Sequence, residues 1–121
     1  MSVTLDLPFP AKALWPNGRA HWGTRRREVA KHRAWAKTAA MATGAYYAGW
    51  PTRFAIALTV HPKTANRVDA DNCIAASKAY LDGIADAMGV DDQCFDAPTV
   101  TFGEPIKGGA FKITVTPRGD K

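Results

Sequence analysis

The sequence has few cysteines and no long hydrophobic run. Its two cysteines, Cys73 and Cys94, are too few for a disulfide framework and lack the paired spacing of a zinc site. We expect both to be buried as small hydrophobic residues in a reducing compartment. No apolar stretch approaches the length of a membrane span, and the start MSVTLDLPFP lacks the cationic and apolar segments of a signal peptide. These absences predict a cytoplasmic protein with no membrane partner.

Acidic residues are scarce outside one segment. Of the 11 Asp and Glu residues, seven lie between Asp69 and Asp96, where Lys78 is the only cation. Elsewhere 15 Lys and Arg residues accompany four acids, and the net charge of the chain is +5. A basic surface attracts phosphate groups, and clustered carboxylates hold the divalent ions that promote hydrolysis of phosphate esters. This distribution favours a metal-dependent enzyme acting on a polyanion. The alternative is a polar helix with solvated acids.

The first half of the sequence predicts two strands and one helix. Apolar and polar residues alternate over residues 3–7, and residues 54–61 are rich in strand formers. Residues 11–24 contain proline and glycines and predict an ordered loop. Residues 25–43 contain helix formers without glycine or proline, and Gly44 is a natural stop. This helix is expected to be basic and amphipathic.

The second half predicts a helix and a hairpin within the same domain. Apolar residues recur at helical spacing from about residue 71 or 72 to residue 88, and Gly89 ends the pattern. Residues 100–103 and 110–117 have the character of strands, and the turn between them predicts a hairpin. The order β-α-β-α-β-β predicts an α+β fold, in which a small mixed sheet packs with two helices. We expect residues 1–121 to form a single compact domain.

Four aspartates are candidate metal ligands. Asp69 and Asp71 are separated by one residue, and alternate residues of an extended backbone face the same side. Asp91 and Asp92 follow the predicted helix, so they meet the first pair only if a neighbouring strand or a partner subunit completes the site. Crowded carboxylates require a cation, and Mg²⁺ suits oxygen ligands while it keeps waters for substrate phosphates. The alternative is that the first pair caps a helix and the second forms a polar turn.

Several motifs together resemble the RusA-type Holliday junction resolvases. There are three central motifs. R-V-D-A-D-N occupies residues 67–72, and G-V-D-D-Q occupies residues 89–93. Between them, Lys78 lies four residues before Asp82, which is followed by a glycine. The opening LPFPAKALWPNGRAHW resembles the strand end and asparagine-containing loop of that family, and EPIKGGAFKITVTP resembles its Lys-Gly-Gly hairpin. The motifs occur in the order of the family and cover most of the chain.

The resemblance implies a small homodimeric endonuclease that binds four-way DNA junctions and cuts them by Mg²⁺-dependent phosphodiester hydrolysis, with Mn²⁺ able to substitute. Asp69 and Asp71 match the paired metal-binding aspartates of the family. Asp92 matches the third catalytic aspartate, with Asp91 beside it as a further ligand. Lys78 matches the lysine expected near the scissile phosphate. A bacterial or prophage origin is also implied.

The position of Lys78 departs from the family pattern. The family lysine lies four residues after the second aspartate, whereas Lys78 lies seven residues after Asp71. One additional helical turn moves the ammonium roughly 5 Å along the axis. If the inserted residues bulge out instead, Lys78 returns to the site. Its alternative role is an i,i+4 ion pair with Asp82.

Basic and aromatic residues in three places are candidate DNA contacts: around the start of the first predicted helix, beside the acidic pair at residues 69 and 71, and in the predicted hairpin turn. They combine guanidinium and ammonium groups, which bind phosphate, with a flat ring that stacks on exposed bases. The candidates are Arg19, His21, Trp22, Arg25, Arg26, Lys63, Arg67 and Lys107. The alternative for the cations is a solvated helix face, and for Trp22 a place in the core.

Two other functions fit the same sequence. One is a branched-DNA-binding protein with no or weak cleavage, which the shifted position of Lys78 favours. The other is a nuclease that prefers flaps or replication forks to four-way junctions.

Overall fold

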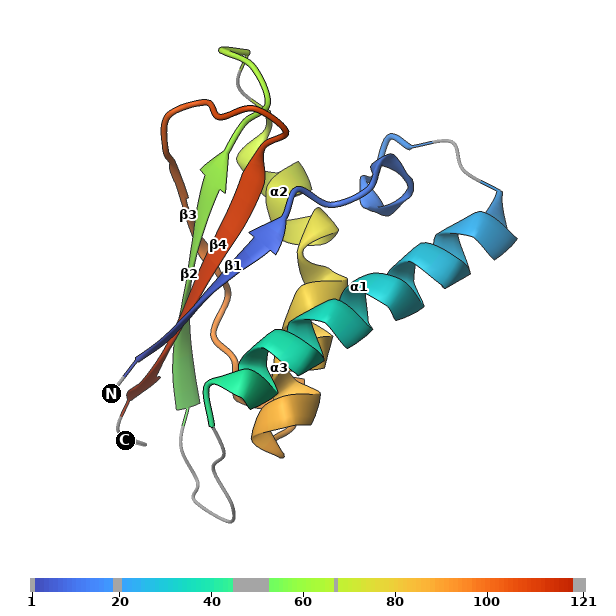
Figure 1. Ribbon diagram of the computed structural model, residues 1–121. Helices are drawn as coiled ribbons and strands as arrows, with labels where there is room; N and C mark the ends of the chain where they lie inside the picture. The colour runs from blue at the N-terminus through green and yellow to red at the C-terminus, as the bar shows by residue number, and fades with distance from the viewer. Residues whose placement is uncertain (1, 19–20, 45–52, 67, 119–121) are drawn as a thin grey trace.

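The computed structural model describes residues 2–18, 21–44, 53–66 and 68–118 (Figure 1). The elements are β1 (Val3–Pro8), η1 (Lys12–Leu14), α1 (Trp22–Ala42), β2 (Arg53–His61), α2 (Ala70–Ala76), α3 (Lys78–Met88), η2 (Asp92–Cys94), β3 (Thr99–Phe102) and β4 (Ala110–Arg118). The chain forms one α+β domain in which the helices pack on one face of a four-stranded mixed sheet. No helix in the described ranges is both long and apolar enough to cross a membrane.

The sheet has the strand order β1-β4-β2-β3. β4 is antiparallel to both β1 and β2, whereas β3 is parallel to β2. The prediction of a β3–β4 hairpin was therefore wrong, because β2 lies between these two strands. The connection that resembled a tight turn is instead bonded to the end of β2: the amide of Gly103 donates to the carbonyl of Val60 at 2.9 Å, and the amide of Ile106 to that of Pro62 at 3.0 Å.

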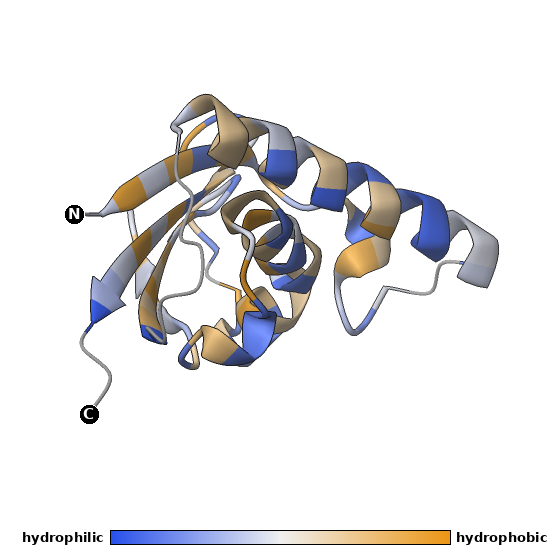
Figure 2. Cartoon of the chain, turned by 90° about the horizontal axis from the view of Figure 1, so that it is seen from below, coloured by the Kyte–Doolittle hydropathy of each residue, from blue (hydrophilic) through white to orange (hydrophobic). Residues whose placement is uncertain are grey.

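The core lies between the sheet and the helices. Alternate residues of β1, β2 and β4 are buried, and in β1 and β4 they alternate with hydrophilic residues (Figure 2). The strands contribute Val3, Leu5, Leu7, Phe54, Ile56, Leu58, Val60, Phe111, Ile113 and Val115 to it, and the helices contribute Ala36, Ala40, Cys73, Tyr80, Ile84 and Met88. The predicted strands at residues 3–7 and 54–61 are thus confirmed.

α1 begins three residues earlier than the sequence predicted. The imidazole Nδ1 of His21 accepts a hydrogen bond from the amide of Gly23 at 3.0 Å and caps the first turn. The helix ends at Ala42, and Gly44 follows with a φ of 77°. His32, Ala36 and Ala40 form the buried side of α1, as the amphipathic pattern predicted.

The second predicted helix is divided into α2 and α3 at Ser77. The Ser77 hydroxyl donates to the carbonyl of Ile74 at 2.7 Å, and the serine is buried. Short hydroxyl side chains compete for backbone carbonyls in this way and interrupt helices. Gly89 ends α3 in the left-handed conformation at φ 74°, as predicted.

A glycine allows α1 and α3 to approach closely. A Cβ atom placed on Gly83 would lie 2.1 Å from the carbonyl oxygen of Arg33 and 3.1 Å from the Cβ of Ala36. The clash involves backbone, so a side-chain rotation cannot relieve it. A Cβ at residue 83 therefore requires the two helices to move apart.

We expect Gly83→Ala to lower the free energy of unfolding by about 1–3 kcal/mol, the usual cost of overpacking a core. An alanine on a free helix face would instead raise it by roughly 0.5–1 kcal/mol, because alanine loses less backbone entropy than glycine. Urea denaturation of both proteins measures the difference. A stabilised variant would show that the helices are not in close contact at this position.

Asp96 ties the segment before β3 to the neighbouring strands. Its amide donates to the carbonyl of Phe54 at 2.8 Å. Its carboxylate accepts from Arg118 at 2.6 and 3.1 Å and from Arg53 at 3.0 Å. These guanidiniums, Arg118 before Arg53, lower the pKa of Asp96 to about 2.

Because the pKa is lower in the folded chain than in the unfolded chain, the Asp96 interaction is fully present near neutral pH and is lost as the pH falls from about 4 towards 2. We expect Asp96→Asn to lower the thermal midpoint at pH 7 and to have a much smaller effect near pH 2, where the Asp96 carboxyl becomes protonated in the folded chain as well. Calorimetry across this range provides the test, with Asp6→Asn as the control on an exposed strand residue. A deficit that persists unchanged at pH 2 would contradict the ion pair.

Candidate functional site

The first aspartate pair lies at the start of α2. Asp69 has an extended backbone and caps the helix, and its Oδ1 accepts from the amide of Asp71 at 2.7 Å. Both aspartates are exposed. The predicted capping role of Asp69 is thus observed, and Asp69 Oδ2 and both carboxylate oxygens of Asp71 have no hydrogen-bond donor within the described chain. These oxygens are available to a ligand from solution.

The second aspartate pair lies beyond α3, where Lys78 binds Asp92. Lys78 Nζ donates to Asp92 Oδ2 at 3.1 Å and to Asp82 Oδ1 at 3.0 Å. The two carboxylates, Asp82 first, raise the pKa of Lys78, and Lys78 lowers the pKa of Asp92. Asp91 caps η2 by accepting from the amide of Gln93 at 2.9 Å. The predicted ion pair between Lys78 and Asp82 is therefore present, with Asp92 as a further partner.

The two aspartate pairs line different pockets. Lys78, Asp91 and Asp92 line a cleft of about 310 Å³ together with Arg33, Asp82 and Asp86. Asp69 lines another, of about 400 Å³. Among the described residues, no group of three or more His, Cys, Asp or Glu residues is placed to hold a metal ion. A single chain thus brings Lys78 to Asp92 but does not join either residue to the first pair.

Most of the acidic segment is neutralised by ion pairs. Besides the contacts of Lys78 and Asp96, Asp86 accepts from Arg33 at 2.6 and 2.9 Å, and this guanidinium lowers the pKa of Asp86. Of the seven acids, Asp82, Asp86, Asp92 and Asp96 have a cationic partner. Asp69, Asp71 and Asp91 have none among the residues described. The acids that remain available to a ligand are therefore fewer than the sequence suggests.

The pocket beside Asp69 contains residues that the sequence analysis did not single out. It is lined by Phe9, Pro10, Lys12, Trp15, Asn17, Lys63, Val68, Asp69 and Asn72. Lys63 was expected near the acidic pair, and it lines the same pocket as Asp69. Lys12 was missed because it lies 57 positions before Asp69 in the sequence, and only the fold brings them together. The density of aromatic, proline and asparagine residues around Lys12 was the available signal.

Two buried side chains hold the connection that forms this pocket. The Tyr80 hydroxyl donates to the carbonyl of Pro8 at 2.6 Å, and the amide of Ala11 donates to His32 Nε2 at 3.1 Å. His32 Nδ1 lies 2.7 Å from the carbonyl of Glu28, which fixes Nδ1 as the protonated nitrogen. Arg25 Nη1 adds a bond to the carbonyl of Ala13 at 2.6 Å. The predicted DNA contact at Arg25 thus has a structural role in anchoring this connection.

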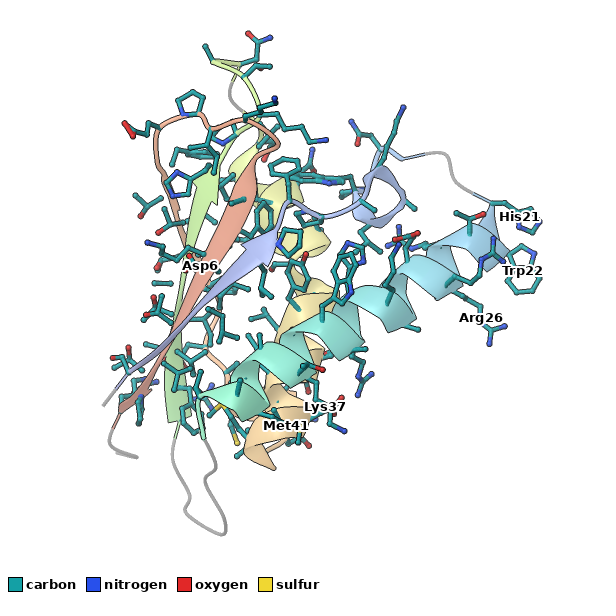
Figure 3. All side chains as sticks on the ribbon, in the orientation of Figure 1. Asp6, His21, Trp22, Arg26, Lys37 and Met41 are labelled. Atoms are coloured by element: carbon teal, nitrogen blue, oxygen red, sulfur yellow. The ribbon has the colours of Figure 1, made fainter. Side chains whose placement is uncertain are left out.

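The other DNA candidates lie in separate places. His21, Trp22 and Arg26 are exposed at the end of α1 that extends beyond the sheet (Figure 3). The Trp22 side chain is 65% exposed, so it is not a core residue, and the Arg26 guanidinium lies 5.6 Å from the centre of its ring. Lys107 is exposed in the β3–β4 connection. Arg19 and Arg67 lie outside the described residues.

The comparison with known proteins identifies a relative that matches most of this chain. No protein-family model matches the chain. An uncharacterized protein of Xylella fastidiosa (strain Temecula1 / ATCC 700964) is 36% identical over 115 residues, which cover 93% of this chain and 75% of the relative. The chain belongs to the same family as this Xylella fastidiosa protein.

Proposed function

We propose that the protein is a metal-dependent endonuclease that binds four-way DNA junctions and cleaves them. The observation that carries the proposal is that the carboxylate of Asp69 lines one pocket with the ammonium groups of Lys12 and Lys63, while the exposed carboxylate of Asp71 lies two residues further along the chain. None of the four has an ion-pair partner among the described residues. Neighbouring carboxylates and ammonium groups that form no ion pair with each other can bind a ligand of both charges. The carboxylates would hold a metal ion, and the ammonium groups would hold a phosphate. The resemblance of the sequence motifs to junction resolvases supports DNA as that ligand.

The first aspartate pair fits Mg²⁺ by the chemistry of its donors. Mg²⁺ takes hard oxygen ligands, and in enzymes it is usually held by one or two carboxylates with waters and substrate phosphates at the other positions. Asp69 and Asp71 supply two exposed carboxylates, and their exposure leaves room for water and phosphate. When bound, such an ion activates water and stabilises charge on the scissile phosphate. Lys12 and Lys63 attract the DNA strand to the same pocket.

The exposed end of α1 provides a further DNA surface. Trp22 offers a flat ring for stacking, and Arg26 lies over that ring with its guanidinium able to reach phosphate. The α1 end extends beyond the sheet, so DNA bound in the pocket and DNA bound at this end need not overlap (Figure 1). Branched DNA offers separate arms for the two surfaces.

A second candidate function is a branched-DNA-binding protein without useful cleavage. The observation that favours it is the ion pair between Lys78 and Asp92, which lies in a different pocket from Asp69. Within a single chain, a site completed by three aspartates would need Asp92 to leave this lysine and approach the first pair. Cleavage assays with Mg²⁺ and Mn²⁺ separate the two functions, because the passive protein binds the junction under both conditions and cuts it under neither.

We expect Asp71→Asn to reduce cleavage of a labelled four-way junction and Arg26→Ala to reduce binding of it. Removing the Asp71 carboxylate weakens the metal site without reducing positive charge, so cleavage in Mg²⁺ should fall at least 100-fold while binding is retained. Removing the Arg26 guanidinium should weaken binding in the absence of metal about 3- to 10-fold, because one phosphate contact is lost. Gel electrophoresis of the cleaved strands and of the bound complex measures both quantities.

The matched control is Glu104→Gln, which removes an exposed carboxylate from the β3–β4 connection. It should leave both cleavage and binding unchanged. If Asp71→Asn cuts the junction at the parental rate, the assignment of Asp71 is wrong. If the parental protein binds the junction but cuts it with neither metal ion, the second candidate function replaces the first.

The proposal includes a homodimer, because a junction contains two equivalent strands to be cut and a two-fold assembly presents two equivalent sites. Light scattering in the presence of salt should give a mass of twice 13.1 kDa at the concentration used for cleavage. A monomer that cleaves both strands in succession would refute this part of the proposal and leave the nuclease intact.

A further inference from the structure

The pocket beside Asp69 has the size of a small-molecule site. Its volume of about 400 Å³ is formed where the β1–α1 connection meets the segment after β2 and the start of α2. Binding sites for small molecules have volumes of roughly 300–1,000 Å³. A double helix is too wide for this space, whereas a single unit of an opened strand is of suitable size.

One wall of the pocket is a fixed aromatic pair. The rings of Phe9 and Trp15 are stacked with their centres 5.2 Å apart, and both pack edge-on against Phe111 at 5.4 and 5.9 Å. Trp15 Nε1 donates to the carbonyl of Pro10 at 3.1 Å. A Cβ atom on Gly109 would lie 2.7 Å from the Phe9 ring, so the glycine makes room for it. The wall is formed before any ligand arrives, so little side-chain entropy is lost on binding.

The polar groups around this wall suit a nucleotide. Lys12 and Lys63 are exposed and have no carboxylate partner among the described residues, and Lys63 Nζ lies 5.3 Å from the centre of the Phe9 ring. Asn17 and Asn72, which carry side-chain amides, also line the pocket. Ammonium groups bind phosphate, and amides donate to and accept from the edge of a base.

We propose that this pocket binds one unpaired nucleotide of the DNA, with the base against Phe9 and Trp15 and its phosphate between Lys12 and Lys63. The inference rests on the proposed function in that DNA is the ligand. Because Asp69 borders the pocket and Asp71 follows it, a nucleotide held here brings the adjoining phosphodiester next to the two carboxylates. The pocket thereby selects DNA in which a base has left its stack, as at a branch point.

The test is a titration of the ¹⁵N-labelled protein, without divalent metal ion, with a single-stranded tetranucleotide and with a blunt duplex of the same base composition. We expect the indole N–H signal of Trp15 and the side-chain amide signals of Asn72 to shift with the single strand and not with the duplex. The shift should saturate, so that a dissociation constant is obtained from the Trp15 signal itself.

Lys12→Ala and Lys63→Ala should each raise this dissociation constant about tenfold, because each removes one of the two cations that hold the phosphate. Lys37→Ala is the matched control: Lys37 is an exposed lysine near Met41 in the C-terminal half of α1, and it does not line the pocket (Figure 3). All three substitutions replace exposed side chains, so the variants should retain the fold, and their amide spectra show whether they do.

The inference would be overturned by equal shifts of Trp15 with the single strand and the duplex, or by equal binding by the lysine variants and the Lys37 control. Signals that shift only at Trp22 would likewise place the base on the α1 end and not in this pocket. The outcome is independent of cleavage. A protein that cuts junctions without a Trp15 response refutes the pocket alone, and a Trp15 response in a protein that cuts no DNA refutes the nuclease alone.

Discussion

The candidate site depends on two buried polar side chains that fix the β1–α1 connection. Tyr80 and His32 lie in the core, and each bonds a backbone group of this connection at Pro8 or Ala11. Burial raises the pKa of Tyr80 and lowers that of His32, so both are neutral and keep the proton positions that these bonds require. A buried polar group without a partner is costly. The chain between β1 and α1 is therefore held at this place by the same contacts that complete the core.

Some charged residues of the described chain form ion pairs between distant elements, whereas those around Asp69 form none. Ion pairs of Asp86 with Arg33 and of Asp96 with Arg53 and Arg118 connect elements that are distant in sequence. Exposed ion pairs contribute little to stability individually. Their larger effect here is to neutralise most of the acidic segment. The carboxylate of Asp69 then shares a pocket with Lys12 and Lys63, and none of the three has an ion-pair partner within the described chain.

Local patterns predicted the elements of the fold but not their pairing. Alternation identified β1, strand-forming residues identified β2, and glycines marked the ends of α1 and α3, because these signals arise within a few residues. The hairpin prediction was wrong because the bonds of Gly103 and Ile106 to the end of β2 are long-range. The prediction of one continuous second helix was wrong because the chain divides it at Ser77, whose hydroxyl bonds a carbonyl of the preceding turn. Similarly, the aspartate pair was visible in the sequence, whereas Lys12, which the fold brings to the pair from the β1–α1 connection, was not.

Under the proposed function, the spacing of Lys78 explains why the cations beside the first aspartate pair come from other parts of the chain. A lysine four residues after Asp71 would lie in α2, close to the first aspartate pair, but Ala75 occupies that position. Lys78 begins α3 after the interruption at Ser77, and its ammonium binds Asp82 and Asp92. The extra residues thus place the lysine with the second aspartate pair and not with the first. Under the proposed function, a cation is still needed beside Asp69 and Asp71, and Lys12 and Lys63 are the lysines that line the pocket there. Under that function, Lys12 from the connection after β1 and Lys63 from the segment after β2 replace the lysine that the family pattern has four residues after the second aspartate.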